Sequence, residues 1–285
     1  MIEIRKVLIT VKTYPTLSLK YAELVCTAGI LDDGKWVRIF PMPFRKLDYD
    51  SKFKKFQWIE LPIKKSTSDY RPESFEVVDW TKIKLLGDVL NRKHSWRNRR
   101  NIVFAKSKVY LDLSEIIDLA KQNVLSLATF KPTRILDFIV EDAMREWDEK
   151  KLRNLENRSK QLSLIQSPEE IKRELQIVKK LPYKFSYRFE DINGKISTMM
   201  IEDWEIGALY WNCLRDAYND EETAIQKVRQ KYWDEFLTKD LHLFLGTTLA
   251  NHLRAPNPFI IIGVFPPPNE KQPPLFRPFE IPLPM

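Results

Sequence analysis

YAELVCTAGILDDGKWVRIF, residues 21–40, decides the fold of the first third of this 285-residue chain. Two runs rich in apolar residues, Tyr21–Ile30 and Lys35–Phe40, flank the pair Asp33-Gly34. An Asp-Gly pair between two such runs is typical of a β-hairpin. Similar short runs lie on either side, at Lys6–Lys12, Phe56–Ile63 and Phe75–Trp80. Five short strands joined by brief turns predict a small β-barrel or a strongly bent sheet.

Helical signals follow this β region. Ser114 is expected to cap a helix over Glu115–Gln122, and Lys131–Arg134 to open a long helix that runs to about Ser163. The middle of that helix, Glu146–Lys160, is so highly charged that we expect a solvated arm.

A second β region is expected near the C-terminus. Asn193-Gly194 separates two apolar runs and predicts another hairpin. The strands of this hairpin are expected at Tyr183–Phe189 and Ile196–Ile201. Two amphipathic helices are expected at Asp203–Tyr218 and Glu221–Leu237. Two late buried strands are expected at Leu241–Gly246 and Phe259–Phe265.

We therefore predict an α+β protein with an N-terminal small β-barrel or bent sheet, a helical middle, and a C-terminal α/β element with a hairpin and two late strands. Five segments are expected: a basic β domain over 1–90, a basic linker over 91–110, a helical arm over 111–181, an α+β domain over 182–265 and a Pro-rich tail over 266–285.

The positive charge of the chain is concentrated at its N-terminal end. Met1–Tyr110 holds 23 Lys and Arg against 12 Asp and Glu, a net of +11, whereas Leu111–Met285 holds 24 against 27, a net of −3. The excess peaks between Asn91 and Lys108, where no acidic residue occurs. Such a distribution favours a polyanionic partner, and nucleic acid, with DNA ahead of RNA, is the leading hypothesis for function.

Aromatic residues lie among these cations and could stack on bases. In Trp36–Phe40, strand alternation puts Trp36, Arg38 and Phe40 on one face and the aliphatic side chains on the other. That face is either an outward binding surface, or part of the core with Arg38 paired to an acid. The nucleic-acid-binding candidates are Trp36, Arg38, Phe40, Arg45, Arg71, Arg92, Lys93, Trp96, Arg97, Arg99 and Arg100.

Two alternatives remain open, and the sequence leaves undecided whether the protein is an enzyme. Cys26 could act as the nucleophile of an enzyme acting on a nucleotide or a base in DNA, with Arg38 or Arg71 holding phosphate; a small buried cysteine is the commoner case. Alternatively, the protein could be a scaffold that binds a protein partner through the charged helix 146–160 or the Pro-rich tail.

No cofactor and no metal site are predicted. Glu202, Asp203 and Glu205 are weak candidates for holding Mg²⁺, but Asp203 and Glu205 more simply favour the start of a helix. Only Cys26 and Cys213 are present, too few for a disulfide scaffold, and no apolar run is long enough to span a membrane. We therefore expect a cytoplasmic protein with no membrane partner.

Three blocks of the sequence together resemble a family of prokaryotic proteins to which no activity is attached: Tyr21–Arg45 (YAELVCTAGILDDGKWVRIFPMPFR), Pro182–Tyr210 (PYKFSYRFEDINGKISTMMIEDWEIGALY) and Asp240–Pro267 (DLHLFLGTTLANHLRAPNPFIIIGVFPP). The resemblance implies a mobile-element or phage-defence setting, and the nucleic-acid-binding hypothesis includes a place in a DNA-modification or phage-defence system. Its relatives carry a Cys-rich turn in the second hairpin that resembles a zinc knuckle. Residues 191–195 read DINGK here, so the resemblance implies no metal for this chain.

Overall fold

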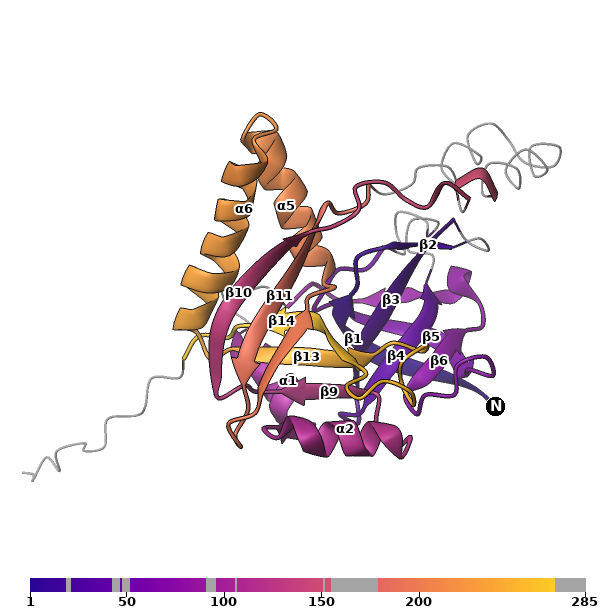
Figure 1. Ribbon diagram of the computed structural model, residues 1–285. Coiled ribbons are helices and arrows are strands. Elements are labelled where there is room, and N and C mark those ends of the chain that lie inside the picture. Colours follow the sequence, from indigo (N-terminus) through magenta and orange to yellow (C-terminus); the bar gives the residue numbers. More distant parts are fainter. Residues whose placement is uncertain are drawn as a thin grey trace, which may run out of the picture.

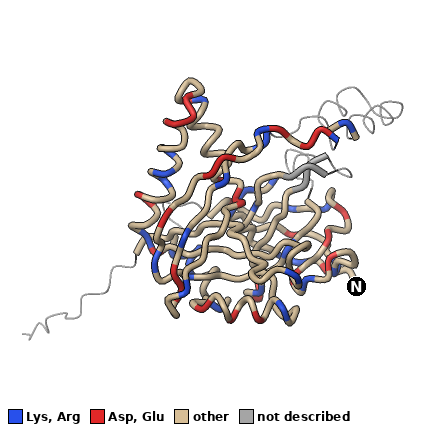
Figure 2. The backbone as a smooth tube through the Cα atoms, viewed as in Figure 1, with Lys and Arg blue, Asp and Glu red and all other residues tan. Residues whose placement is uncertain are grey.

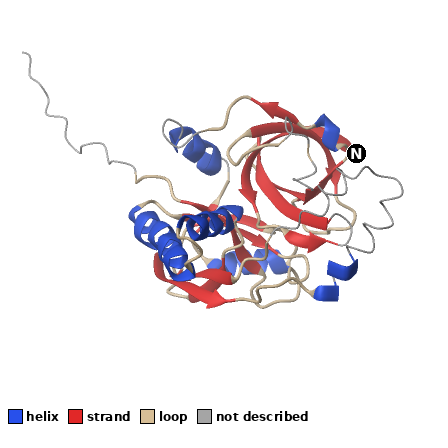
Figure 3. Ribbon diagram, turned by 90° about the horizontal axis from the view of Figure 1, so that it is seen from above, coloured by secondary structure: helices blue, strands red, loops and turns tan. Residues whose placement is uncertain are grey.

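The computed structural model describes residues 1–18, 22–42, 47, 52–90, 96–105, 107–150, 152–154 and 179–269. The fold is α+β, with a closed β-barrel at the N-terminus (Figures 1 and 3). The barrel strands, in spatial order, are β1 (Ile2–Lys12), β3 (Ala22–Leu31), β4 (Trp36–Met42), β6 (Ser74–Val77) and β5 (Trp58–Lys65). Pairing of β5 with β1 closes the barrel, and every pairing except β4 with β6 is antiparallel.

Two short strands extend the barrel sheet. β2 (Thr16–Ser18) pairs with β3, and β7 (Lys84–Leu86) pairs with β5. A single turn of 3-10 helix, Trp80–Lys82, lies between β6 and β7. The predicted hairpin at Asp33-Gly34 is confirmed, since it joins β3 to β4; Gly34 has a φ of +88°, which glycine adopts without a Cβ clash.

The interior of the barrel is filled with aliphatic side chains. Strand alternation directs Val7 and Ile9 of β1 and Val37 and Ile39 of β4 inward, where all four are fully buried. Phe53 belongs to the same cluster. The barrel interior is therefore a packed core.

A second sheet covers one outer face of the barrel. It has the order β14 (Phe259–Phe265), β13 (His242–Thr247), β9 (Leu127–Phe130) and β8 (Val109–Tyr110). We call the contact between barrel and sheet the seam. The buried side chains of the seam are Leu8, Val11, Ala28, Ile30, Phe56, Val103, Leu127, Phe244, Ile262 and Phe265.

Helix α1 (Trp96–Ala105) lies in the segment for which the sequence predicted a basic linker. Val103 of this helix is fully buried in the seam, and Trp96, Ile102 and Phe104 pack against it. The helix forms because its apolar side chains are buried between the barrel and the sheet. The prediction of a linker rests on the charged residues and does not consider these apolar side chains.

A third sheet and three helices complete the C-terminal half. The sheet has the order β10 (Arg134–Asp142), β11 (Tyr183–Glu190) and β12 (Ile196–Met200). The main helices are α2 (Leu113–Lys121), α5 (Trp204–Asp216) and α6 (Glu221–Arg229), and α6 continues as a π-helical turn, Gln230–Glu235, and a 3-10 turn, Phe236–Thr238. The predicted second hairpin and late strands are confirmed.

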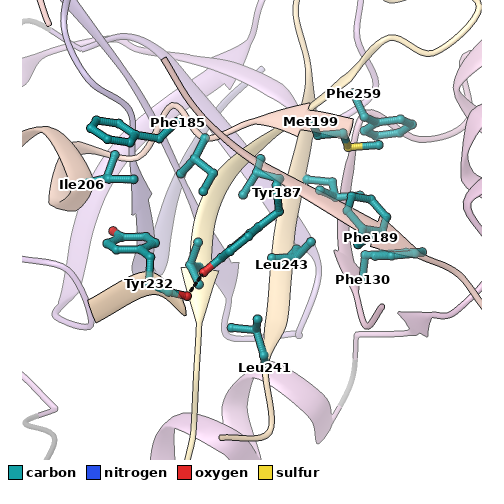
Figure 4. Close-up of a cluster of buried hydrophobic side chains, with 14 of the residues drawn as sticks. Phe130, Phe185, Tyr187, Phe189, Met199, Ile206, Tyr232, Leu241, Leu243 and Phe259 are labelled. Atoms are coloured by element: carbon teal, nitrogen blue, oxygen red, sulfur yellow. Dashed lines mark hydrogen bonds between the residues drawn. The ribbon is translucent and has the colours of Figure 1, made fainter. Parts of the chain in front are cut away.

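Aromatic side chains build the core of this half (Figure 4). Phe185, Tyr187 and Phe189 of β11 point to the same buried side, as their alternation predicts. The Tyr187 hydroxyl is buried and donates to the Tyr232 carbonyl, so this polar atom is satisfied inside the core.

The prediction of a long helix beginning at Lys131–Arg134 is wrong for the first part of that helix, because residues 134–142 form strand β10. Phe138, which lies within the predicted helix, instead stacks on Phe185 of β11 with ring centres 5.9 Å apart. Pairing with β11 buries this β-branched and aromatic segment, and such tertiary contacts override a helical spacing. Of the expected continuation, residues 149–150 and 152–154 are helical, and 155–178 lie outside the described residues.

The cap of α2 also differs from the prediction. Asp112, rather than Ser114, is its N-cap, and the Asp112 carboxylate accepts a hydrogen bond from the Ser114 amide at 2.7 Å. Among the described residues, no helix is both long enough and apolar enough to cross a membrane.

Candidate functional site

Arg38 of β4 lies on the outer face of the barrel, as alternation predicts, but that face is buried by the second sheet. The guanidinium donates to the Ser74 hydroxyl at 3.2 Å, the Ser126 hydroxyl at 2.6 Å and the Ser126 carbonyl at 3.1 Å. Only 1% of Arg38 is exposed. The expectation that Arg38 belongs to an open binding surface is therefore wrong, because its donors bond acceptors of the protein itself.

Arg71 enters the same cluster from the loop before β6. It donates to the Asp69 carboxylate at 2.8 and 2.5 Å and to the Thr247 carbonyl of β13. Both members of the Arg71–Asp69 pair are buried. Like Arg38, Arg71 joins the barrel to the second sheet and does not present its charge to solvent.

Cys26 of β3 approaches these two arginines. Its amide donates to the Thr13 hydroxyl at 3.0 Å, and the residue as a whole is half-buried. Burial raises the pKa of the Cys26 thiol, and the charges of Arg38 and Arg71 oppose that increase without reversing it. Cys26, Arg38 and Arg71 thus converge as the enzyme hypothesis requires, but the thiol is not activated as a thiolate.

His252 extends the cluster, although no sequence pattern predicts a role for it. Its ring nitrogens lie 3.0 Å from the Thr247 hydroxyl and 2.9 Å from the Asn123 amide oxygen, and the residue is fully buried. Burial lowers the pKa of His252 to about 4, and Arg71 and Arg38 contribute in the same direction. His252 is therefore neutral at pH 7 and acts as a hydrogen-bonding side chain.

The aromatic candidates also pack into the seam. Trp36 meets Phe244 edge to face, with ring centres 5.2 Å apart, and Trp96 lies 5.6 Å from Phe265. Phe40, the third candidate, is half-buried. The rings of Trp36 and Trp96 therefore stabilise the contact between barrel and sheet.

Arg99 and Arg100 of α1 both make contacts within the fold. The Arg99 guanidinium lies 4.0 Å from the centre of the Phe56 ring and donates to the Leu90 carbonyl. Arg100 pairs with Asp240 at 2.8 Å. Both side chains turn toward the seam, so most of the predicted charge of α1 is used for packing.

Arg97 and two lysines of the loop before β5 remain exposed. Lys52 and Lys54 precede Phe56, and Arg97 precedes Arg99, so the contact between Phe56 and Arg99 makes the two segments neighbours. Within the described part of the chain, no acidic side chain pairs with any of these three cations. We call Lys52, Lys54 and Arg97 the cationic surface.

Basic and acidic positions occur side by side over the rest of the barrel (Figure 2). Several of the exposed barrel lysines have acidic partners: Lys35 with Asp33, Lys64 with Glu76, Lys82 with Asp79, and Lys84 with Glu60. Three further candidates, Arg45, Arg92 and Lys93, lie outside the described residues.

The acids considered for Mg²⁺ serve other purposes. The Asp203 side chain caps α5 by accepting from the Glu205 amide at 3.2 Å. The Lys55 ammonium donates to both Asp203 oxygens, at 3.1 and 3.0 Å, and to Glu205 at 3.1 Å. Burial raises the pKa of Glu202. Lys55 thus supplies the positive charge that the buried Asp203 carboxylate needs.

Lys12 lies at the end of β1, and no sequence pattern predicts a role for it. Its ammonium donates to the Phe53 carbonyl at 3.3 Å and lies 5.4 and 5.8 Å from the ring centres of Phe53 and Trp204. Burial, together with the charge of Lys55, lowers the pKa of Lys12 to about 7. No sequence signal separates Lys12 from the exposed Lys6, since both bracket the same apolar run.

Two family models match the chain, and both describe domains of unknown function. Residues 3–105 match Domain of unknown function (DUF8758), and residues 111–280 match Domain of unknown function (DUF8757). The second match covers more than half of the chain, which therefore belongs to the DUF8757 family. The predicted membership of a family without an established activity is confirmed at this level. No curated protein matches the sequence.

Proposed function

We propose that this protein binds nucleic acid and that the cationic surface contacts its phosphates. The observation that carries the proposal is the exposure of Lys52, Lys54 and Arg97 on two neighbouring segments without acidic partners among the described residues. Phosphate contacts need several exposed cations close together, and arginine adds bidentate geometry.

The charge of the whole N-terminal region supports the same proposal. Its net charge is +11, but Arg38, Arg71 and Arg99 are buried and cannot reach a partner without unfolding the seam. We therefore expect only a few contacts between the protein and the phosphates. Three phosphate contacts correspond to a slope of log affinity against log salt of about −2.7 for duplex DNA and about −2.1 for a single strand.

The experiment reverses the three charges together. In the variant Lys52→Glu/Lys54→Glu/Arg97→Glu we expect weaker binding of a 20-nucleotide DNA, measured by fluorescence anisotropy, and a salt slope close to zero. The control is Lys184→Glu/Arg188→Glu/Lys227→Glu, three exposed cations on β11 and α6 with the same change in net charge. The control should keep the wild-type slope.

Equal loss of binding in both triple variants would mean that net charge alone matters and that this surface is not the site. Unchanged affinity in the first variant would reject the proposal directly. Repeating the titration with RNA of the same sequence tests the preference for DNA. A setting in DNA modification or phage defence stays a prediction.

A further inference from the structure

A cavity of about 460 Å³ lies between the barrel and the elements that follow α1. From the barrel, Leu31, Trp36 and Phe75 line it; from the other side, Tyr110, Leu125 and Leu127 do so. We call it the seam cavity. Its volume is within the range of small-molecule sites, which start near roughly 300 Å³.

The walls of the seam cavity suit a flat, partly apolar ligand. Three of its lining side chains are aromatic and half-buried: Trp36, Phe75 and Tyr110. The indole N–H of Trp36 is buried and has no hydrogen-bond partner within the described part of the chain. Because this N–H has almost no accessible surface, a ligand in the cavity would contact the Trp36 ring and not the N–H.

The charged residues around the cavity give it no excess of positive charge. Arg5 bonds Glu3 and Asp33, each at 3.2 Å, and Lys35 lies 3.7 Å from Asp33. Lys108 pairs with Glu115 and lies 4.5 Å from the centre of the Tyr110 ring. Cations and carboxylates therefore balance, leaving both donors and acceptors for a neutral polar ring.

Helix α1 links this cavity to the cationic surface. Arg97 lies in its first turn, and Ser107 and Lys108, which line the cavity, follow its last residue closely. Ten helical residues span about 15 Å, which is about four nucleotides of one strand at the spacing in a duplex. A strand held at Arg97 is thus long enough to reach the cavity within a few nucleotides.

We propose that the seam cavity binds a nucleobase, either of a free nucleoside or of an unpaired nucleotide in a strand. Flat rings stack on aromatic side chains, and every base carries both donors and acceptors on its edge. The cavity is separate from the cationic surface, and binding of an uncharged nucleoside does not rest on the phosphate contacts proposed above.

The test titrates adenosine, guanosine, cytidine and thymidine separately and measures saturation by calorimetry and NMR. We expect at least one nucleoside to bind with a Kd below about 1 mM, the value equivalent to about −4 kcal/mol. Val124→Trp should weaken that binding at least tenfold, since Val124 lines the cavity, is 58% exposed and can accept a larger ring without disturbing the core. The matched control, Val78→Trp, alters a 41% exposed valine outside the cavity and should leave binding unchanged.

A second variant keeps the proposal testable if Val124→Trp does not fold. Tyr110→Leu removes one ring and should also weaken nucleoside binding, with folding of every variant checked by circular dichroism. Failure of all four nucleosides to saturate, or equal affinity in wild type, Val124→Trp and Tyr110→Leu, would overturn the proposal.

The source of the base is decided by competition. If an eight-nucleotide single strand displaces the nucleoside, the cavity takes an unpaired base of a strand; if it does not, the ligand is a free nucleoside. The charge-reversed variant Lys52→Glu/Lys54→Glu/Arg97→Glu should still bind the nucleoside. This result separates failure of the cavity from failure of the cationic surface.

Discussion

Cys26 shows how burial and charge compete at one side chain. Two guanidinium groups lie near its thiol, yet burial raises the pKa, so the thiolate is scarce near pH 7. We expect iodoacetamide to modify Cys26 more slowly in the folded protein than in the protein unfolded by urea. Intact-mass measurement on Cys213→Ser, which leaves Cys26 as the remaining cysteine, reports the rate.

Cys26→Ser gives the complementary background, in which Cys213 alone reacts. Rapid stoichiometric labelling of folded Cys26 at pH 7 would contradict this prediction and would favour the nucleophilic enzyme over the nucleic-acid-binding protein.

Lys12 makes stability depend on pH. Its pKa is about 7 in the folded protein and about 10.4 in an unfolded chain. The unfolded state therefore binds more protons between these values, and the free energy of unfolding should rise with pH by up to about 1.4 kcal/mol per unit across this window. Of its charged neighbours, Lys55 lowers the pKa of Lys12 and Glu205 opposes that decrease.

Lys12→Met should remove that rise, and Lys6→Met, at the exposed lysine on the other side of the same run, should keep it. Urea denaturation at pH 7, 8 and 9 measures the difference between the two variants. Parallel pH profiles for Lys12→Met and the wild type would show that Lys12 is charged in the folded state.

At the level of elements, α5 meets the segment after β1 at a glycine. A Cβ on Gly207 would lie 2.3 Å from ring atoms of Tyr14. Tyr14 is held there because its hydroxyl donates to the Lys179 carbonyl at 2.7 Å and accepts from the Trp211 indole at 2.8 Å. The helix and the ring can approach this closely only because position 207 has no side chain.

Gly207→Ala should therefore destabilise the protein by about 1–3 kcal/mol, although alanine favours an isolated helix by about 1 kcal/mol. In a Tyr14→Ala background the same substitution should become neutral or stabilising. Thermal unfolding of the four proteins of this cycle measures the coupling, and additive effects would show that the ring does not limit the approach.

The elements also show what the sequence could and could not predict. Turn residues and alternation locate the hairpins β3–β4 and β11–β12 because both signals are local. The same local signals do not predict β10, because its pairing with β11 depends on a segment more than forty residues further along the chain. The prediction for Arg38 is wrong for a different reason. Alternation assigns the face of Arg38 correctly, but no local sequence signal shows that β13 and β9 cover that face.

At the scale of the molecule, the two matched families meet at the seam. Residues 3–105 and 111–280 match separately, yet Val103, Phe244 and Phe265 lie in one buried cluster. A fragment of residues 1–105 alone exposes that apolar surface. We expect it to bind an apolar dye and to unfold at lower temperature than the full chain.

Addition of a fragment of residues 111–285 should restore the melting temperature and release the dye. A fragment 1–105 that melts cooperatively at the temperature of the full chain would show that the barrel does not need its cover.

The edge-to-face contact of Trp36 with Phe244 bears on how this family can change over time. Each ring belongs to a different matched segment, and each fills space that the other leaves. A chain that acquired one segment from a distant relative would bring together two halves that had never been selected side by side. Such a chain should have mismatched side chains at the seam and a lower stability, even though each segment is recognisable by itself.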